Sequence, residues 1–313
     1  QIVWGIPIPA KLCEHCHKGY ADIDDKLQTC PVCNKPLIHD PDTFDTWFSS
    51  GQWTLLALGY PNSQDLNIYH PTDVMETGHD LIFKWIPRMV IFAEYLKQET
   101  PFHTVYLHGL INDAKGKKMS KSKGNVVSPI DIADKFGSDS LRMGLIVGNA
   151  PGHDLPLLEA KIKGYKNFAN KLWNITRFIL THIESTNTNS PTSIINLTWD
   201  QLTKTDQVHL EQFKVILADI TNDYENFRFH LASEKIYHYI WDILASQIIE
   251  DSKSRLNSDN EMEKNSARYV LLHILIDSVK MLHPLMPFIT EEIWSMIPHG
   301  EKDLLIVTPW PKF

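Results

Sequence analysis

The sequence predicts a parallel α/β sheet wrapped by helices, from the N-terminus to about Gly152, followed by an all-α helical bundle. Up to Gly152 short β-rich runs alternate with helical stretches, which is typical of parallel sheets. Beyond it, apolar residues recur at spacings of three and four. The 313 residues, 43% of them hydrophobic, are enough to fill two cores. We therefore predict two domains, 1–152 and 153–313.

The first chemically distinctive segment holds two cysteine pairs. The chain's four cysteines lie in Cys13-x-x-Cys16 and Cys30-x-x-Cys33. Two such knuckles supply the tetrahedral sulfur set that zinc prefers, whereas disulfide pairing is the alternative. Four thiolates leave no open coordination position, so the zinc would be structural. We expect a zinc-binding insertion over about 11–38.

A basic loop at 117–125, with the letters KKMSKSKGN, is the second distinctive segment. The run 105–109 predicts a strand closed by glycine, and Pro129 opens an amphipathic helix. Between a strand and a helix, backbone amides can bind an anion and lysines add mobile positive charge. The loop therefore predicts a site for a polyphosphate such as ATP. A solvated basic turn is the alternative.

Helical periodicity dominates the second half of the chain. The predicted helices are 157–182, 206–223, 227–249, 260–282 and 290–296. The polar stretch 184–191 interrupts them because its Ser, Thr and Asn residues favour local bonding over helix and its proline blocks continuation. We expect a surface loop there, inside the bundle.

Composition limits the class of protein. No segment has the pattern of a signal peptide or the length of an apolar membrane span, so we expect a cytoplasmic protein without a membrane partner. The formal net charge is −8. That charge does not exclude RNA binding, because a local basic patch can bind phosphates on an acidic protein.

The letters of the basic loop carry a family resemblance. Lys118-Met119-Ser120-Lys121-Ser122 is identical to the KMSKS signature of class I aminoacyl-tRNA synthetases. Other segments resemble the valyl branch of that family: 2–10 the return from its editing insertion, 45–50 the strand that follows, 72–89 the adenylate pocket, 139–142 the junction with the bundle, and 167–174 the first helix of the anticodon-binding bundle. The resemblance covers nearly the whole chain and implies a partial Rossmann-like catalytic fold plus a helical anticodon-binding domain.

The resemblance implies an activity: ATP-dependent activation of valine to valyl-adenylate, then transfer to tRNA(Val), with magnesium accompanying ATP. It makes Lys118 and Lys121 the catalytic residues, which stabilise charge on the phosphates. It assigns ATP contacts to Gly78, Asp80, His108, Gly109, Met119, Ser120, Lys121 and Ser122. A helix N-cap is the alternative for Asp80, and simple packing is the alternative for His108.

Two tryptophans match family positions that line the amino-acid pocket. Trp47 and Trp85 could form an apolar slot sized for a branched side chain, although most tryptophans simply occupy the core. In the bundle, unstacked anticodon bases would stack on aromatic side chains. The candidate platforms, about half of them expected in the core, are Phe227, Arg228, Phe229, Tyr237, Tyr239 and Trp241.

The sequence also departs from the family pattern. The His-x-Gly-His signature of the first half of the nucleotide fold, the editing domain and the C-terminal coiled coil are all missing. We therefore expect a fragment that is incomplete for catalysis and whose partners include the missing N-terminal half of the catalytic domain and the editing domain. The alternatives are a tRNA-binding module without chemistry, or the isoleucyl relative.

Overall fold

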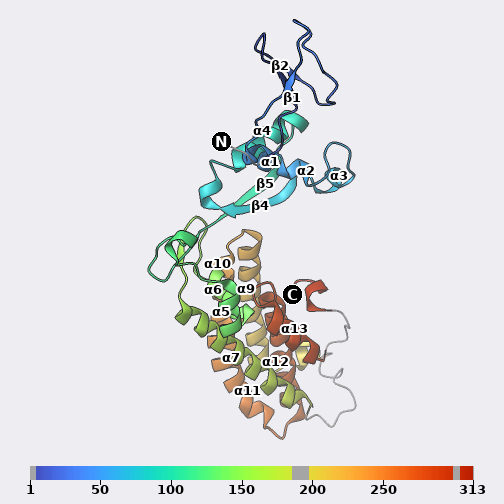
Figure 1. Ribbon diagram of the computed structural model, residues 1–313. Helices are drawn as coiled ribbons and strands as arrows, with labels where there is room; N and C mark the ends of the chain where they lie inside the picture. Colours follow the sequence, from blue (N-terminus) through green and yellow to red (C-terminus); the bar gives the residue numbers. More distant parts are fainter. Residues whose placement is uncertain (1–4, 185–196, 299–303, 313) are drawn as a thin grey trace. The chain divides into compact units, whose positions relative to one another are not determined.

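The computed structural model describes residues 5–184, 197–298 and 304–312 (Figure 1). It consists of two compact units, Gln1–His108 and Gly109–Phe313, each with its own architecture. Three parts of the sequence considered above lie outside the described residues: 2–4 of the segment that resembles the valyl branch, 185–191 of the predicted loop, and Phe313 at the end of the chain.

The first unit begins with a small antiparallel sheet that carries the cysteines. Its strand order is β2-β1-β3, with β1 (Ala10–Cys13) between β2 (Lys18–Ala21) and β3 (Ile38–His39). Lys11 of β1 is buried, donates to the carbonyl of Leu27 at 2.6 Å and pairs with Asp25 at 2.6 Å and Asp22 at 3.4 Å. These carboxylates compensate the burial of its ammonium group and raise its pKa, Asp25 contributing most. One lysine thus ties the loop after β2 to the central strand.

The rest of the first unit is an α/β segment. Parallel strands β4 (Thr72–Gly78) and β5 (Phe102–His108) are joined by the 3-10 turn η1 (His79–Leu81) and the crossover helix α4 (Ile86–Lys97). Short helices α1 (Thr46–Gly51), α2 (Trp53–Leu56) and α3 (Asp65–Tyr69) precede them. The core of this segment is formed by Met75, Ile86, Met89 and Phe102. The strand predicted at 105–109 is confirmed as the end of β5.

The strand expected at 45–50 is wrong, since this segment forms helix α1. The Asp45 carboxylate accepts the backbone N–H of Trp47 at 2.9 Å, which caps the helix. Phe44 and Phe48 stack with their ring centroids 4.2 Å apart, which fixes the entry of the chain into the first turn. Thr46, Trp47 and Phe48 favour a strand locally, so the cap and the packing of the helix outweigh that preference.

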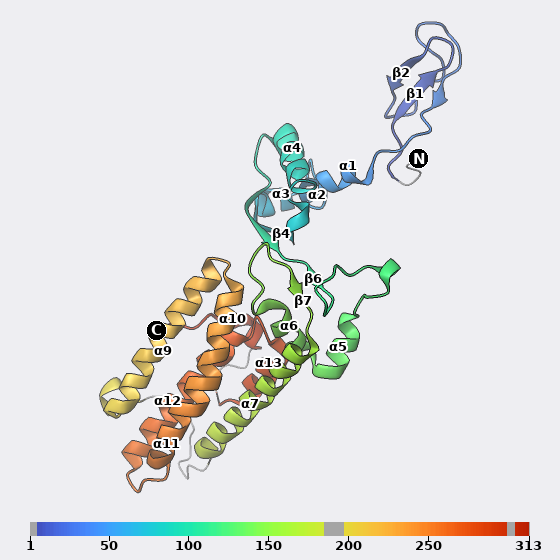
Figure 2. The same cartoon turned by 90° about the vertical axis from the view of Figure 1, so that its left-hand side faces the viewer.

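The second unit opens with a minimal parallel sheet, β6 (Ile111–Asn112) and β7 (Leu155–Pro156). The lysine loop with its 3-10 turn η2 (Lys121–Lys123), helix α5 (Pro129–Phe136) and helix α6 (Ser138–Ile146) lie between these strands in the chain (Figure 2). The unit boundary at 108 precedes the domain boundary expected at 152. The reason is a core that α5 and α6 share with the first bundle helix, formed by Ile132, Phe136, Leu141 and Ile162.

Each of the five predicted ranges is helical over most of its length, although the helices begin at Glu159 and Phe229, two residues after the predicted starts. The elements of the bundle are α7 (Glu159–Glu184), η3 (Trp199–Gln201), α9 (Lys204–Glu225), α10 (Phe229–His238), the π-helical η4 (Tyr239–Ile248), α11 (Ile249–Leu256), α12 (Glu261–Leu282), α13 (Pro287–Met296) and η5 (Leu305–Val307). Helix α12 contacts both α7 and α9 and is buried along most of its length (Figures 1 and 2). Among the described residues, none of the helices has the length and apolar character needed to cross a lipid bilayer.

Helix α6 is attached to the bundle by two polar side chains. Asp139 accepts the backbone N–H groups of Phe288 at 3.2 Å and Ile289 at 2.7 Å, at the start of α13. Arg142 donates to the carbonyls of Pro284 at 2.8 Å and Leu285 at 3.0 Å, just after α12. Arg142 therefore binds carbonyls just beyond the C-terminal end of α12.

Candidate functional site

Two of the predicted nucleotide residues lie side by side. Gly78 ends β4, His108 ends β5, and the two are register partners in the parallel pair. The His108 ring is hydrogen-bonded through Nδ1 to the Glu76 carboxylate of β4. The carboxyl ends of parallel strands are where open α/β sheets bind ligands. The structure therefore brings Gly78 and His108 together at a position suited to a nucleotide.

Asp80 does not cap a helix. It lies within η1 and is exposed, while Gly78 occupies the N-cap position of this turn. The capping alternative is therefore wrong. The carboxylate sits one turn beyond the end of β4, where it can accept hydrogen bonds from hydroxyl groups.

Of the two predicted pocket tryptophans, Trp47 lies on α1 and Trp85 at the N-cap of α4. Trp85 precedes the first residue of α4 and donates its indole N–H to the carbonyl of Ser50 at 2.9 Å. The Arg88 guanidinium lies over the Trp47 ring, 5.0 Å from its centroid. Trp85 instead packs edge-on against Trp53, which is exposed and which the sequence did not single out, at a centroid distance of 6.3 Å.

The lysine loop presents its charges to solvent. Lys117, Lys118, Lys121 and Lys123 are all exposed, whereas Met119 and Ser120 are partly buried. The Met119 sulfur accepts the backbone N–H of Val127 at 3.4 Å. The Ser120 and Ser122 hydroxyls are hydrogen-bonded at 3.2 Å. The structure thus gives a loop with an anchored base and exposed positive charges.

Two polar residues that sequence reasoning missed organise the base of this loop. The Asp113 Oδ1 atom accepts the backbone N–H groups of Lys115 at 2.9 Å and Lys117 at 2.8 Å. Its Oδ2 atom accepts the Asn125 amide N–H at 2.8 Å. The Asn125 Oδ1 atom in turn accepts the backbone N–H of Ser120 at 2.9 Å. We call Asp113 and Asn125 the loop bracket.

Gly109 has a packing role that its sequence position did not reveal. A Cβ added there would lie 1.6 Å from the backbone oxygen of His153. Only glycine allows this approach of the chain segments next to β6 and β7. Backbone packing accounts for the glycine, and its predicted contact with ATP stays a prediction.

The four cysteines form a compact cluster. Their Sγ atoms lie within 4.8 Å of one another, with 3.4 Å between Cys13 and Cys33 and 3.5 Å between Cys16 and Cys30. Tetrahedral zinc with bonds of about 2.3 Å would separate its sulfur ligands by about 3.8 Å, so the residues fit the ion. The cysteines are free thiols, not disulfides.

The electrostatics of the cluster also favour a cation. Burial opposes ionisation of Cys30, but hydrogen bonds from Tyr20 and from backbone amides outweigh it and lower its pKa to about 6. Burial and the neighbouring thiols raise the pKa of Cys16 to about 12. Four sulfurs this close cannot all ionise without a compensating positive charge. A divalent metal supplies that charge, and ligands to it must be thiolates.

None of the six candidate anticodon platforms is fully exposed. Tyr239 is buried, so it serves the bundle core. Arg228 is paired with Asp223 at 2.7 Å. Tyr237 and Trp241 are partly buried and stack with their centroids 5.9 Å apart. Tyr237 and Trp241 therefore remain the better placed of these four for contact with a base.

In comparisons with known proteins, two family models match different parts of the chain. The family model described as tRNA synthetases class I (I, L, M and V) matches residues 1–157, and the anticodon-binding domain of tRNA ligase matches residues 206–313. The chain is 37% identical over 316 residues to a valine--tRNA ligase of Clostridium tetani and 39% identical over 314 residues to that of Carboxydothermus hydrogenoformans. All of this chain aligns with each, but it spans only 35% of their length.

Solved structures share the fold. The ternary LeuRS–tRNA–LeuAMS complex of Agrobacterium radiobacter K84 superposes with a TM-score of 0.74 at 23% identity, over 99% of this chain and 41% of that one. Mycobacterium tuberculosis methionyl-tRNA synthetase with methionyl-adenylate gives a TM-score of 0.69 at 20% identity, over 86% of this chain and 52% of that one. At these identities the likeness concerns architecture alone.

Proposed function

Because the chain belongs to the class I tRNA synthetases of the isoleucine, leucine, methionine and valine group, we propose that it is part of a valine--tRNA ligase. The observation that carries the valine assignment is the alignment of the whole chain with valine--tRNA ligases at 37% and 39% identity. The reaction is attack of the valine carboxylate on the α-phosphorus of ATP, which releases pyrophosphate. The valyl group is then transferred to the 3′ end of tRNA(Val), in the cytoplasm.

The lysine loop supplies the electrostatic part of this reaction. Negative charge develops on the phosphates, and Lys118 and Lys121 would stabilise it without transferring protons. Magnesium bound with ATP would share that task. In this proposal the loop is kept close to the phosphates by Met119, Ser120 and Ser122.

The strand ends supply the nucleoside contacts in this proposal. Gly78 allows close backbone approach, and Asp80 accepts ribose hydroxyl groups. The Glu76 carboxylate holds the His108 ring in one orientation at the end of β5. Gly109 is proposed as the adjoining contact.

The remaining parts have structural and recognition roles. Residues 1–152 are proposed as the second half of the catalytic domain, with the zinc insertion at about 11–38, and 153–313 as the anticodon-binding domain. Trp47 and Trp85 form one wall of the valine pocket in this proposal. Cys13, Cys16, Cys30 and Cys33 would hold zinc, which fixes the two knuckles to each other. The N-terminal half of the catalytic domain and the editing domain are the proposed partners.

The test is valine-dependent exchange of pyrophosphate into ATP by the complete enzyme that contains this chain. We expect exchange with valine to exceed exchange with isoleucine by about a hundredfold, because a larger side chain is excluded sterically. Equal or faster exchange with isoleucine would indicate the isoleucyl relative. Binding of tRNA without any exchange would instead indicate a module without chemistry.

A further inference from the structure

The lysines of the loop are exposed, so the backbone beneath them decides where their charges lie. Gly116 and Gly124 adopt positive φ angles of 74° and 65°, and a Cβ at either would meet nothing within 4 Å. Packing therefore does not restrain these turns. Hydrogen bonds at the base of the loop hold these turns instead.

Asp113 shapes the first turn of the loop. One carboxylate oxygen accepts two backbone N–H groups, those of Lys115 and Lys117. The backbone of Asp113 also donates to the Lys117 carbonyl at 2.9 Å and accepts from Gly116 at 2.9 Å. A carboxylate that accepts several amides holds a turn strongly, because such bonds are charge-assisted. This turn sets the direction in which the chain leaves β6.

Asn125 closes the loop from its other end. Its amide nitrogen donates to Asp113 at 2.8 Å and to the Lys118 carbonyl at 3.3 Å, while its oxygen accepts the Ser120 N–H at 2.9 Å. The amide nitrogen and the carbonyl oxygen of the Asn125 side chain are therefore both hydrogen-bonded, with two bonds donated and one accepted. The bonds to Lys118 and Ser120 hold the backbone on either side of Met119. Lys121 is the residue that follows Ser120 in the chain.

We propose that Asp113 and Asn125, the loop bracket, are positioning residues that place Lys118 and Lys121 for the stabilisation of the ATP phosphates. The inference rests on the function proposed above. Neither bracket side chain touches ATP in this proposal. They act through the backbone of the lysine loop, whose charges are useful only if they are held where negative charge develops.

The charge state of Asp113 agrees with this role. The Asn125 amide, the Lys117 and Lys115 N–H groups and the nearby Lys117 charge together lower its pKa, although partial burial opposes them. The carboxylate is therefore ionised at neutral pH. Its hydrogen bonds would weaken only as the pH falls through this lowered pKa.

A double-mutant cycle in the complete enzyme tests the proposal. Four forms are compared by valine-dependent pyrophosphate exchange: the unmodified enzyme, Asn125→Ala, Lys121→Ala, and both substitutions together. We expect Asn125→Ala to lower kcat by about tenfold to a hundredfold, with a smaller change in the KM for ATP, because misplaced charge mainly affects the transition state. In the Lys121→Ala background the same change should cost several-fold less, because only Lys118 is then left for the bracket to position and coupled residues do not add.

The conservative variant and the controls sharpen the test. Asp113→Asn keeps an acceptor for the backbone N–H groups, so it should retain more activity than Asp113→Ala. Matched controls are Asp134→Ala on the exposed face of α5 and Asn257→Ala, whose amide donates to the Lys253 carbonyl at the end of α11. Both controls should exchange at the unmodified rate.

The outcomes separate the two proposals. No valine-dependent exchange by the unmodified enzyme would overturn the proposed function and this inference with it. A second outcome would overturn the inference alone: the unmodified enzyme exchanges normally, and Asn125→Ala lowers the rate by the same factor in both backgrounds. Such an equal loss indicates less folded protein, which lowers every rate by the same factor. An Asn125→Ala enzyme with unmodified kcat would also overturn it.

Discussion

At the scale of single residues, the lysines of the loop are chemically alike but differ in their expected roles. All four are exposed, so burial does not distinguish them. Their distinction comes from position, because Lys121 begins the turn η2, directly after the segment 118–120 that Asn125 holds, whereas Lys123 is two residues further along.

We therefore expect Lys121→Ala to lower kcat for pyrophosphate exchange in the complete enzyme by about a hundredfold or more, the usual cost of removing one transition-state charge contact. Lys123→Ala removes the same charge from the same loop and is the matched control. It should change kcat by less than about threefold. Equal losses from the two variants would mean that the loop acts only through its total charge.

The sequence predicted a role for the lysines but did not reveal the loop bracket that holds them. A run of basic residues is visible in a short window, whereas the partners Asp113 and Asn125 lie twelve residues apart and meet only after the loop has closed. One signal was present: Asp113 followed by Gly116 is typical of a turn in which the carboxylate accepts backbone N–H groups. The packing role of Gly109 was not visible in the sequence for a related reason, because its close neighbour His153 is far away along the chain.

At the scale of elements, periodicity predicted the bundle helices well, whereas the family resemblance gave a strand at 45–50 where the chain forms helix α1. Helices such as α12 bury a long apolar surface, so their spacing pattern is repeated many times. Helix α1 is only six residues long and is decided by one capping carboxylate, Asp45. The sequence alone does not show whether the cap of a short helix or the strand preference of its residues prevails, because the result depends on which residues pack against the segment.

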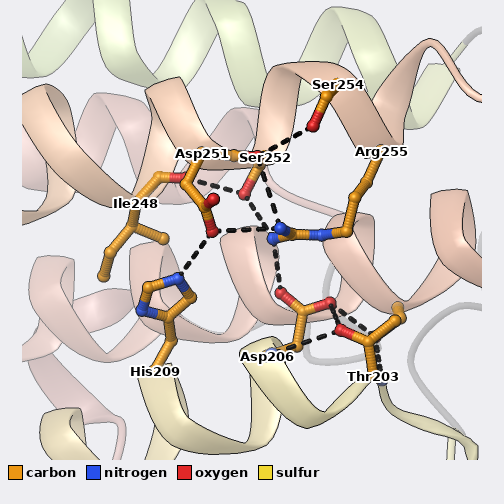
Figure 3. A network of polar contacts seen from close by, with 9 residues as sticks. Thr203, Asp206, His209, Ile248, Asp251, Ser252, Ser254 and Arg255 are labelled. Atoms are coloured by element: carbon orange, nitrogen blue, oxygen red, sulfur yellow. Dashed lines mark hydrogen bonds and ion pairs between the residues drawn. The ribbon is translucent and has the colours of Figure 1, made fainter.

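The N-terminus of α9 is tied to α11 and α12 by a buried polar network (Figure 3). Asp206 is fully buried and binds Arg255 at 2.8 Å. Its second oxygen accepts the hydroxyls of Thr203 at 2.7 Å and Ser266 at 2.6 Å. One carboxylate therefore links three helices of the bundle.

We expect Asp206→Ala to lower the free energy of unfolding of the bundle by about 3 kcal/mol, because it leaves a partly buried guanidinium without its closest partner. Denaturant unfolding followed by helicity measures this change. Glu250→Ala, which breaks the exposed pair with Lys253, is the control and should cost less than about 1 kcal/mol. A smaller loss from Asp206→Ala than from Glu250→Ala would contradict this account of the network.

The same network predicts a pH dependence. Hydrogen bonds from His209 and then from Arg255 lower the pKa of Asp251 despite some burial. A depressed pKa in the folded state gives stability that is present above the unfolded value of about 3.9 and is lost as the pH falls through the folded value. The stability difference between the unmodified chain and Asp251→Asn should therefore shrink below about pH 4. A difference that stays constant in acid would show that the charge of Asp251 contributes nothing.

At the scale of the whole molecule, the chain is two compact units whose cores are separate. The core of the α/β segment uses residues between Met75 and Phe102, and the bundle core uses residues from Met143 onward. The small sheet that carries the cysteines has little apolar core of its own, since Ile23, Val32 and Ile38 are exposed. A domain this poor in buried apolar surface needs a metal or a disulfide to fold.

Removal of zinc should therefore act locally. We expect one zinc per chain, and we expect that a chelator, or Cys13→Ser, will raise amide hydrogen exchange across residues 10–39 while far-UV helicity stays unchanged, because the bundle does not depend on that segment for its core. His15→Ala, which lies between Cys13 and Cys16 but is not one of the four clustered sulfur residues, is the control and should keep the full zinc content. Two disulfides without metal would contradict the site, and loss of bundle helicity on chelation would contradict the independence of the units.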